Sequence, residues 1–422
     1  MNKYFKGIAA ILAGLTVTNL SAQQTKLTTG ELDGRQNTIT SAVPFLLITP
    51  NARAGAMGDA GVATPNDPNA IHWNSAKMVF NEKNGTVSLS YNPWLRDLVP
   101  DVSLSYLSIM GKINDKASLG GSLRYFSLGE IQFTDITGNS LGNATPSEWA
   151  ADLAYAQKLS DNFSLGVAFR FIYSNIAGGA QTQSQSGIKA GTSYAADITT
   201  YYRNKTKVQG YKINYGIGGA ITNIGSKLTY TTDQNQNFIP INLRIGGYGE
   251  VEIDKYNTIA LALDFNKLLI PTPPVYEYDS SGNPVIDRQT GSLVIASGKS
   301  PNVPIIQGMT QSFSDAPGGF KEEMREINIS AGLEYWYDKQ FALRAGYFHE
   351  SQFKGNRKYA TFGVGIRYNV FTIDAAYLVS FGQRNPLDNT LRFTLGLDFD
   401  ALKSGSNEKE QPAGIFEMPK DN

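Results

Sequence analysis

The sequence predicts an all-β fold, a 14-stranded antiparallel transmembrane β-barrel with an N-terminal plug segment inside its lumen. Apolar residues alternate with small or polar ones over most of the chain, the alternating segments are about ten residues long, and short and long connections alternate. Strands that cross a bilayer need about 9 to 11 residues, whereas ordinary strands average about five or six. We therefore favour a barrel over a soluble β-sandwich, in which half-buried strands also alternate.

The strand pattern is clearest in KYATFGVGIRY, residues 358–368. Phe362 and Val364 share an apolar face, while Gly363 and Arg367 lie on the small or polar face. Fourteen segments alternate in this way: 85–95, 101–113, 116–128, 148–159, 163–171, 192–204, 210–222, 239–253, 257–268, 326–337, 340–349, 358–368, 371–381 and 391–399. An even number of antiparallel strands is typical of bacterial outer-membrane barrels.

The connections between these segments differ in length. Short ones lie at 113–115, 159–162, 254–257, 337–339 and 368–371, and longer ones at 129–147, 175–191, 271–325 and 382–389. In outer-membrane barrels short turns face the periplasm and long loops face the outside. The sequence therefore predicts an outer surface dominated by the loop 271–325.

Composition agrees with an exported, strand-rich wall. The 422 residues include 42 glycines, 22 tyrosines and 21 phenylalanines but only 18% charged residues, which suits a wall with aromatic girdles. Cysteine is absent, which excludes disulfides and thiolate sites. The 37 basic and 37 acidic residues cancel, so no overall charge favours nucleic acid as a partner.

The first residues predict a cleavable export signal over 1–22. Lys3 and Lys6 precede a short apolar run over residues 8–17, and the small residue Ala22 ends the segment. A spanning helix needs about 20 apolar residues, so this run is too short for a membrane anchor. Export places the mature chain beyond the inner membrane.

The small or polar face of the predicted strands carries charges of both signs. Six residues are basic and five acidic: Arg124, Asp152, Arg170, Arg244, Asp264, Glu334, Arg344, Arg367, Asp374, Arg392 and Asp398. Rings of one sign would indicate an ion-selective pore. This mixture predicts ion pairs within the lumen or with the plug.

Residues 45–83 are predicted to plug the lumen. The stretch NARAGAMGDAGVATPNDPNAIHWNSAKM, residues 51–78, is rich in Ala and Gly and has too few large apolar side chains to form its own core. Two helical patterns, around 52–62 and 69–79, flank a turn from which Asp67 can cap the second. The candidate plug residues are Phe45, Arg53, Asp59, His72, Trp73 and Asn74.

Two long motifs resemble the PorV family, the FadL-like outer-membrane barrels of type IX secretion. AVPFLLITPNARAGAMGDAGVATPNDPNAIHWNSAKM, residues 42–78, resembles the start of that family, and SFSDAPGGFKEEMREI, residues 312–327, resembles its loop motif. The wider FadL group carries Asn-Pro-Ala in the plug, where this sequence has Asn74, Ser75 and Ala76. That departure argues against a FadL-type transport role.

The resemblance implies partner proteins. PorV proteins associate with the translocon barrel SprA, bind secreted cargo by its C-terminal signal domain, and deliver it to an attachment complex that contains PorU. Physically, the candidate binding surface is the loop 271–325, whose first part has turn signals at 281–283 and 290–291 and predicts a projecting hairpin. Its exposed apolar residues either bind cargo or pack on one another: Tyr276, Tyr278, Val285, Ile286, Leu293 and Ile295.

The second part of this loop places apolar residues at helical spacing. Met309 and Phe313 lie on such a pattern, and Phe320 follows a break at Pro317 and two glycines. Docking at the translocon and roofing of the barrel mouth are both compatible with this segment. We select Met309, Phe313 and Phe320 as candidate contact residues.

Two other functions stay open: a FadL-like channel for hydrophobic small molecules and a lipopolysaccharide deacylase. A channel needs an apolar pocket at the plug. A deacylase needs a histidine, a serine and an acid within hydrogen-bond reach, and neither His72 near Ser75 nor His349 near Ser351 supplies such a triad in sequence. Metal ligands are few and no glycine motif lies between a strand and a helix, so we predict no enzyme and no cofactor.

The predicted organisation follows from these segments. A signal peptide occupies 1–22, a periplasmic N-terminal extension 23–44, the plug 45–83, the barrel 84–400 and a mobile periplasmic tail 401–422. The barrel is expected in the outer membrane, surrounded by its lipid.

Overall fold

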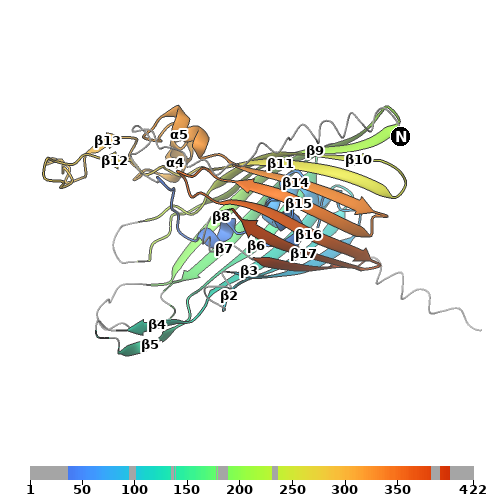
Figure 1. Ribbon diagram of the computed structural model, residues 1–422, viewed down its shortest axis with the longest axis horizontal. Helices are drawn as coiled ribbons and strands as arrows, with labels where there is room; N and C mark the ends of the chain where they lie inside the picture. The colour runs from blue at the N-terminus through green and yellow to red at the C-terminus, as the bar shows by residue number, and fades with distance from the viewer. Residues whose placement is uncertain are drawn as a thin grey trace, which may run out of the picture. The chain divides into compact units, whose positions relative to one another are not determined.

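The computed structural model describes residues 37–94, 101–134, 137, 139–176, 178, 189–230, 236–381 and 390–399. The predicted signal peptide and the predicted tail lie outside this part of the chain. Within it, a closed antiparallel barrel has the strand order β1-β18-β17-β16-β15-β14-β11-β10-β9-β8-β7-β6-β3-β2 (Figure 1). The prediction of a closed 14-stranded barrel is therefore confirmed.

The barrel strands follow the predicted alternation closely. They are β1 Gly85–Pro93, β2 Val102–Asn114, β3 Ala117–Leu128, β6 Ser147–Lys158, β7 Phe163–Asn175, β8 Gly191–Val208, β9 Tyr211–Gly225, β10 Asn242–Glu252, β11 Asn257–Leu268, β14 Asn328–Tyr337, β15 Phe341–His349, β16 Lys358–Tyr368, β17 Phe371–Ser380 and β18 Leu391–Asp398. Two small hairpins lie in the connections: β4 Ile131–Thr134 with β5 Ser140–Ala144, and β12 Val275–Tyr276 with β13 Ile295–Ser297.

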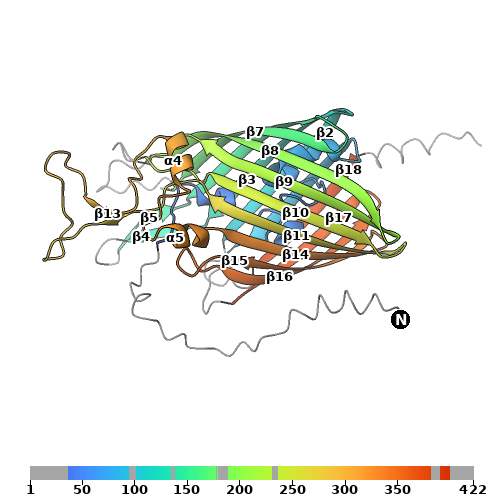
Figure 2. The same ribbon diagram turned by 90° about the horizontal axis from the view of Figure 1, so that it is seen from above.

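The barrel has two different ends. At the turn end, strands are joined by the short connections 115–116, 159–162, 209–210, 253–256, 338–340 and 369–370. At the opposite, loop end lie the longer connections, with β4, β5, β12, β13 and the helices α4 Ile305–Gln311 and α5 Phe320–Arg325 (Figure 2). By the rule for outer-membrane barrels, the turn end faces the periplasm.

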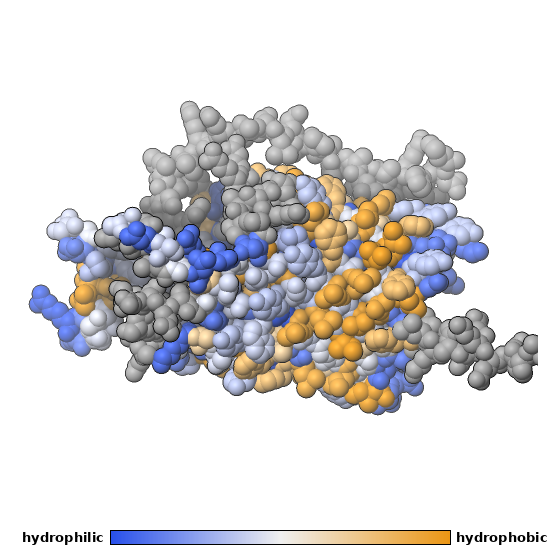
Figure 3. All heavy atoms as spheres, turned by 90° about the horizontal axis from the view of Figure 1, so that it is seen from below, coloured by the Kyte–Doolittle hydropathy of each residue, from blue (hydrophilic) through white to orange (hydrophobic). Residues whose placement is uncertain are grey.

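The outer face of the wall is apolar. Side chains such as Leu89, Ile109, Leu261 and Phe362 alternate with buried neighbours and are about half exposed. Figure 3 shows apolar residues gathered over the wall and hydrophilic residues toward both ends of the barrel. Such a large exposed apolar surface fits contact with lipid, because soluble monomers rarely expose continuous patches of more than a few hundred Å².

Among the described residues, no helix combines the length and the apolar content that would let it cross a bilayer.

Residues 42–80, which we call the luminal segment, bond to strands all round the barrel and therefore lie inside it. This segment contains η1 Pro44–Leu47, α2 Ala52–Gly55, α3 Ala70–Trp73 and η2 Ser75–Phe80. Its hydrogen-bonded pairs with β1, β3, β7, β11, β14 and β18 are Asn69–Ser88, Leu46–Arg124, Ala76–Ser164, Gly61–Asp264, Arg53–Glu334 and Asp59–Arg392.

The helices of the luminal segment are shorter than the predicted patterns over 52–62 and 69–79. The first ends at Gly55, and the chain then turns through Gly58 and Asp59, which have φ values of 66° and 63°. Residues in the left-handed conformation end helices, and here they end α2 after a single helical turn. Asp67 Oδ1 accepts from the Asn69 N–H at 2.8 Å just before α3, but the N-cap residue of that helix is Asn69, and no side chain caps it, so the predicted cap is wrong.

Small residues on both sides let the luminal segment lie directly against the wall. A Cβ added to Gly218 would overlap the Val62 carbonyl, and one added to Gly346 would overlap the Gly58 amide. The Ala- and Gly-rich composition of residues 51–78 therefore matches glycines on the inward face of the strands. The segment's packing partner is the barrel wall.

The structure corrects the predicted location of residues 23–44 where it describes them. Asn37 Nδ2 donates to the Pro273 carbonyl (3.0 Å) and to Glu322 Oε1 (3.1 Å), and the Ala42 N–H donates to the Phe238 carbonyl (2.9 Å). These partners belong to the loop end, opposite the short periplasmic turns. The apolar residues that follow Ala42 are buried at this end of the lumen, which brings the preceding residues to the same side.

Candidate functional site

The candidate site is the loop end, and its first part is a helical platform, residues 305–326. It consists of α4, α5 and the residues between them. Ile305 and Met309 of α4 pack on an apolar cluster that fills the loop end of the lumen and includes Phe45, Leu46 and Phe238. One side of α4 thus roofs the barrel mouth, which was one of the two predicted roles of this segment.

Buried ion pairs fix α5 to the barrel. Lys267, at the end of β11, lies 3.0 Å from Glu323 Oε2 and 2.5 Å from Glu326 Oε2. Lys354, in the connection after β15, lies 2.6 Å from Glu322 Oε1 and 2.9 Å from Glu326 Oε1. Paired and hydrogen-bonded charges can remain buried, whereas leaving one of them unpaired is costly. The two lysines therefore hold the three glutamates of KEEMREI in one arrangement.

Hydrogen bonds from the hydroxyl and the amide of Thr272 complete this base. Glu326 also accepts from Thr272 Oγ1 at 2.7 Å, and Asp315 Oδ2 accepts from the Thr272 N–H at 3.2 Å. Burial alone would raise the pKa of the Glu322 carboxyl, but hydrogen bonds from Lys354 and the Gly318 N–H outweigh it and lower that pKa. Glu322 therefore stays ionised in the folded platform.

The outer side of the platform is apolar and open. Ile306 is 66% exposed, Phe313 53%, Phe320 79% and Met324 51%. Four large apolar side chains thus stand exposed on a base held by buried ion pairs, and such a surface needs little further ordering to bind a partner. Phe313 and Phe320 were predicted contact residues, whereas Met309 points toward the lumen cluster.

The second part of the site is the hairpin, residues 275–297. Tyr278, Ile286 and Leu293 are exposed, while Tyr276, Val285 and Ile295 are partly buried. The N–H of Val285 donates to the Glu277 carbonyl and its carbonyl accepts from the Val294 N–H, both at 2.9 Å. Three of the six predicted residues are thus exposed to solvent, and the other three are partly buried.

Each turn of the hairpin is capped by an aspartate. Asp279 Oδ1 accepts from the Ser281 and Asn283 amides, and Asp287 Oδ1 accepts from the Gln289 amide. These hydrogen bonds lower the pKa of both carboxyls, chiefly through the Asn283 N–H for Asp279 and the Gln289 N–H for Asp287. The two turns of the hairpin are therefore held by their own local contacts.

The predicted plug residues have structural contacts inside the barrel. Arg53 makes a bidentate pair with Glu334 (2.8 and 3.0 Å), and Asp59 accepts from Arg392 (2.6 Å). Asn74 caps η2 by accepting from the Ala76 N–H. Phe45 lies in the apolar cluster described above, and Trp73 Nε1 donates to Asn51 Oδ1 at 2.9 Å.

The predicted pairing of luminal charges holds for several residues. Arg170 pairs with Asp152 and Asp197, and Arg344 pairs with Glu334 and Asp374: the four N–O distances are 2.6, 3.1, 2.7 and 2.7 Å. Arg392 differs because its acid, Asp59, lies in the luminal segment. Charges of the wall thus pair both with one another and with the segment they surround.

Among the described residues, neither histidine forms a hydrogen bond with a serine. His72 Nδ1 lies 2.6 Å from Arg124 Nη2 and must accept this bond, since a guanidinium has only donors. Ser75 Oγ instead contacts Thr199 Oγ1, and Glu350, beside His349, pairs with Arg357. The geometry of a Ser-His-acid triad is absent around both histidines.

Sequence reasoning missed the residues that hold the platform. Lys267 and Lys354 were not selected, although three glutamates within five residues at 322–326 need cationic partners if they are buried. Lys267 lies at the end of β11 and Lys354 in the connection after β15, so their proximity to the glutamates appears only in the fold. Ile306 and Met324 were also left out of the candidate set.

A closed barrel with an apolar outer wall defines a membrane-spanning β-barrel protein. The family model of the type IX secretion system protein PorV matches residues 31–275, more than half of the chain. The chain therefore belongs to the PorV family, and its role lies in type IX secretion. A search of curated proteins returns no match.

Several solved barrels are similar in fold. The P. putida toluene transporter TodX is 12% identical, with 83% of this chain and 98% of that chain covered and a TM-score of 0.45. The Ralstonia pickettii toluene transporter TbuX is 10% identical (82% and 96% covered, TM-score 0.40), and a Pseudomonas aeruginosa FadL homologue is 12% identical (83% and 99% covered, TM-score 0.39). The fold assignment itself rests on the strand pairing described above.

Proposed function

We propose that this protein binds cargo and translocon at its loop end and shuttles cargo to the cell surface in type IX secretion. In this proposal the platform docks on a SprA-like translocon barrel, and the hairpin binds the C-terminal signal domain of the cargo. The cargo then passes to the PorU-containing attachment complex. The export signal proposed for residues 1–22 brings the chain to the outer membrane.

The observation that carries the proposal is the exposed apolar surface of the platform. Ile306, Phe313, Phe320 and Met324 stay exposed, whereas Ile305 and Met309 of α4 pack on the apolar cluster in the lumen. Exposed aromatic and Met side chains on a rigid base are enriched at protein interfaces. Membership in the PorV family supports a partner from the secretion machinery.

Deletion of residues 275–296 tests the assignment of the hairpin. We expect a heat-modifiable barrel that stays in the outer membrane and still co-purifies with the translocon, but no longer retains cargo. The hairpin hydrogen-bonds mainly within itself, so its removal leaves the barrel intact. Unchanged cargo capture by the shortened chain would contradict this assignment.

The two alternatives have less support from the described residues. A channel for hydrophobic small molecules needs an apolar pocket, yet Phe45, Leu46 and Phe238 fill the apolar end of the lumen. A lipopolysaccharide deacylase needs a nucleophile beside a histidine, and His72 and His349 have other neighbours. Unaltered lipid A mass spectra after replacement of both histidines would agree with a non-enzymatic protein.

A further inference from the structure

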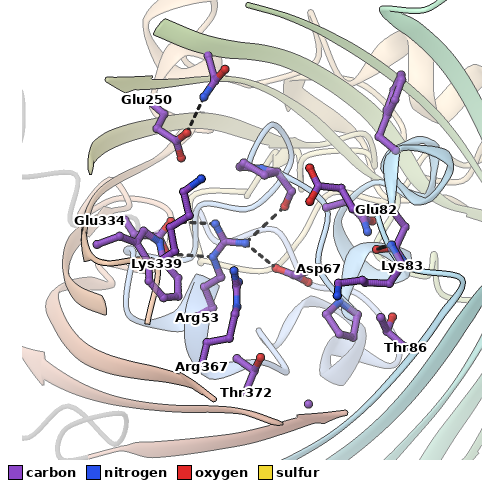
Figure 4. Close-up of a pocket in the computed structure, with 18 of the residues that line it drawn as sticks. Arg53, Asp67, Glu82, Lys83, Thr86, Glu250, Glu334, Lys339, Arg367 and Thr372 are labelled. Atoms are coloured by element: carbon purple, nitrogen blue, oxygen red, sulfur yellow. Dashed lines mark hydrogen bonds and ion pairs between the residues drawn. The ribbon is translucent and has the colours of Figure 1, made fainter. Parts of the chain in front are cut away.

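A cavity of about 700 Å³ lies at the turn end of the lumen, away from the platform and the hairpin (Figure 4). We call it the vestibule. Residues of three short turns line it, namely Asp161, Lys339 and Asn369, so it lies at the periplasmic end of the barrel. Its inner boundary includes Arg53 and Asp67 of the luminal segment.

One wall of the vestibule is strongly basic. β8 pairs with β7 only as far as Tyr202, but its pairing with β9 continues to Val208 and Tyr211, so the β8–β9 hairpin extends beyond β7. Strand alternation places Arg203, Lys205 and Lys207 on one face of this extension. Arg203 lies over the ring of the buried Phe80, at 4.1 Å, and this contact identifies the face as the luminal one. Arg203 and Lys205 line the vestibule directly.

A second group of cations lies across the lumen, on β14 to β16. Arg367 stacks over the Trp336 ring at 4.9 Å, and Lys339 lies in the turn beside it. Figure 4 shows Arg367 and Lys339 near Arg53, whose guanidinium is already bonded to Glu334 and Asp67. Strand order separates β8 from β16 by five other strands, so the two basic groups face one another across the vestibule.

Within the described part of the chain, these cations form no ion pairs. Among the described residues, no carboxylate lies within 4.0 Å of the charged nitrogens of Arg203, Lys205, Lys207, Lys339 or Arg367, whereas Lys83 and Lys212 are paired. Of the acids in the lining, Glu250 already accepts from Asn214 (2.8 Å) and Tyr248 (2.8 Å), and Glu82 and Asp161 are unpaired. Among the described residues that line the vestibule, unpaired cations therefore outnumber unpaired acids by four to two.

We propose that the vestibule binds an extended, acidic polypeptide segment of a periplasmic partner. An arginine whose guanidinium stacks on an aromatic ring, as at Arg203 and Arg367, keeps its N–H donors free to bind a carboxylate. Two basic groups on opposite walls suit an extended chain that spans the opening and brings carboxylates to both of them. The mobile carboxylates of such a segment would approach from the periplasm, where the vestibule opens.

The test uses the full chain in detergent and fluorescein-labelled octaglutamate, with binding followed by fluorescence anisotropy. We expect salt-sensitive binding that weakens about tenfold or more in the double variant Lys205→Glu/Lys207→Glu and in Arg367→Glu, because like charges repel. The control is Lys116→Glu/Lys255→Glu, which makes the same charge change in turns outside the vestibule. Heat-modifiability on gels verifies that each variant keeps its barrel.

Several outcomes would overturn the proposal. Equal weakening in the control variant would mean that the peptide binds to surface charge in general. Displacement by inorganic phosphate at the same concentration as by free glutamate peptide would indicate a small-anion site. Tighter binding only after removal of residues 400–422 would mean that the chain's own C-terminal segment is the occupant, and no partner in trans would be required.

Discussion

The platform and the hairpin lie at the same end of the barrel but are held in different ways. The platform is tied to the barrel by Lys267 and Lys354, which are buried beneath α5. The hairpin is held by hydrogen bonds within residues 277–294 and by two capped turns at Asp279 and Asp287. The first is part of the barrel's packing, and the second is a small structure attached to it.

This difference suggests a division of work. A surface fixed by buried ion pairs keeps one shape and suits a permanent partner, because little entropy is lost on docking. A hairpin held by local turns can adjust to successive ligands, as cargo binding requires. Substitutions that loosen one region and leave the other intact would test this division.

The largest effect is expected for Glu326→Ala. Its carboxylate contacts both buried lysines and Thr272, so its loss leaves buried donors with fewer acceptors and costs about 3 kcal/mol. We expect faster amide exchange over the platform, residues 305–326, and loss of translocon co-purification. Hydrogen exchange of the detergent-solubilised chain measures the first, and pull-down from native membranes the second.

Glu277→Ala is the matched control for Glu326→Ala. Glu277 is exposed in the hairpin, and the change should leave platform exchange unaltered. Platform exchange that is equally slow in Glu326→Ala and in the unaltered chain would mean that the ion pairs do not hold α5.

Gly319→Ala should loosen the platform to a smaller degree. Gly319 precedes α5 with φ 65° and ψ −153°, a region that essentially only glycine adopts, so a side chain costs about 1 to 3 kcal/mol. No atom lies within 4 Å of the added Cβ, so the effect comes from the backbone alone. Gly282→Ala, at a hairpin turn with φ 82°, is the counterpart. Each change should raise amide exchange only in its own region.

Phe320→Ala should change binding without changing stability. This side chain is mostly exposed, so its removal leaves no cavity, but a central aromatic contact contributes more than about 1 kcal/mol at an interface. We expect several-fold weaker association with the translocon and unchanged exchange in the platform. Tyr278→Ala on the hairpin should instead reduce cargo retention. The reverse result, with Phe320 needed only for cargo, would exchange the roles of the two regions.

The barrel wall could be predicted from sequence because the residue pattern of each strand indicates which side chains face lipid and which face the lumen. The alternation of apolar and small residues, as at Phe362 and Gly363, is visible within a single strand, because one face of the strand meets lipid and the other faces a crowded lumen. The direction of residues 37–48 could not be predicted in this way, because they form no strand. Their position depends on the apolar cluster around Phe238, which only the closed barrel brings together.

The candidate site was predictable only in part for the same reason. Exposure of Tyr278, Phe313 and Phe320 follows from turn signals and helical spacing within a single loop. The pairing of Lys267 with Glu326 joins residues 59 positions apart, and a single sequence shows no local sign of it. Long-range ion pairs of this kind decide whether an exposed loop has one shape or many.

The smallest expected effect separates the two regions by pH. The pKa of Asp279 is lowered by amide hydrogen bonds, the Asn283 N–H first, so its capped turn is favoured while the carboxyl is ionised. This contribution is present above the unfolded pKa of about 3.9 and is lost as pH falls through the lower folded value. Asp279→Asn keeps an acceptor oxygen at the cap but has no titrating proton.

Amide NMR shifts of Gly282 from pH 6 to pH 3, measured on the full chain, report on this turn. We expect the shift to move at the acid end in the unaltered chain and to stay nearly constant in Asp279→Asn. Glu322 also has a lowered pKa, but its partner Lys354 is buried, so platform amides should shift together as one unit when the carboxyl is protonated. If the Gly282 and platform amides moved at the same pH in both chains, the hairpin would be coupled to the platform, and the two regions would act as a single binding surface.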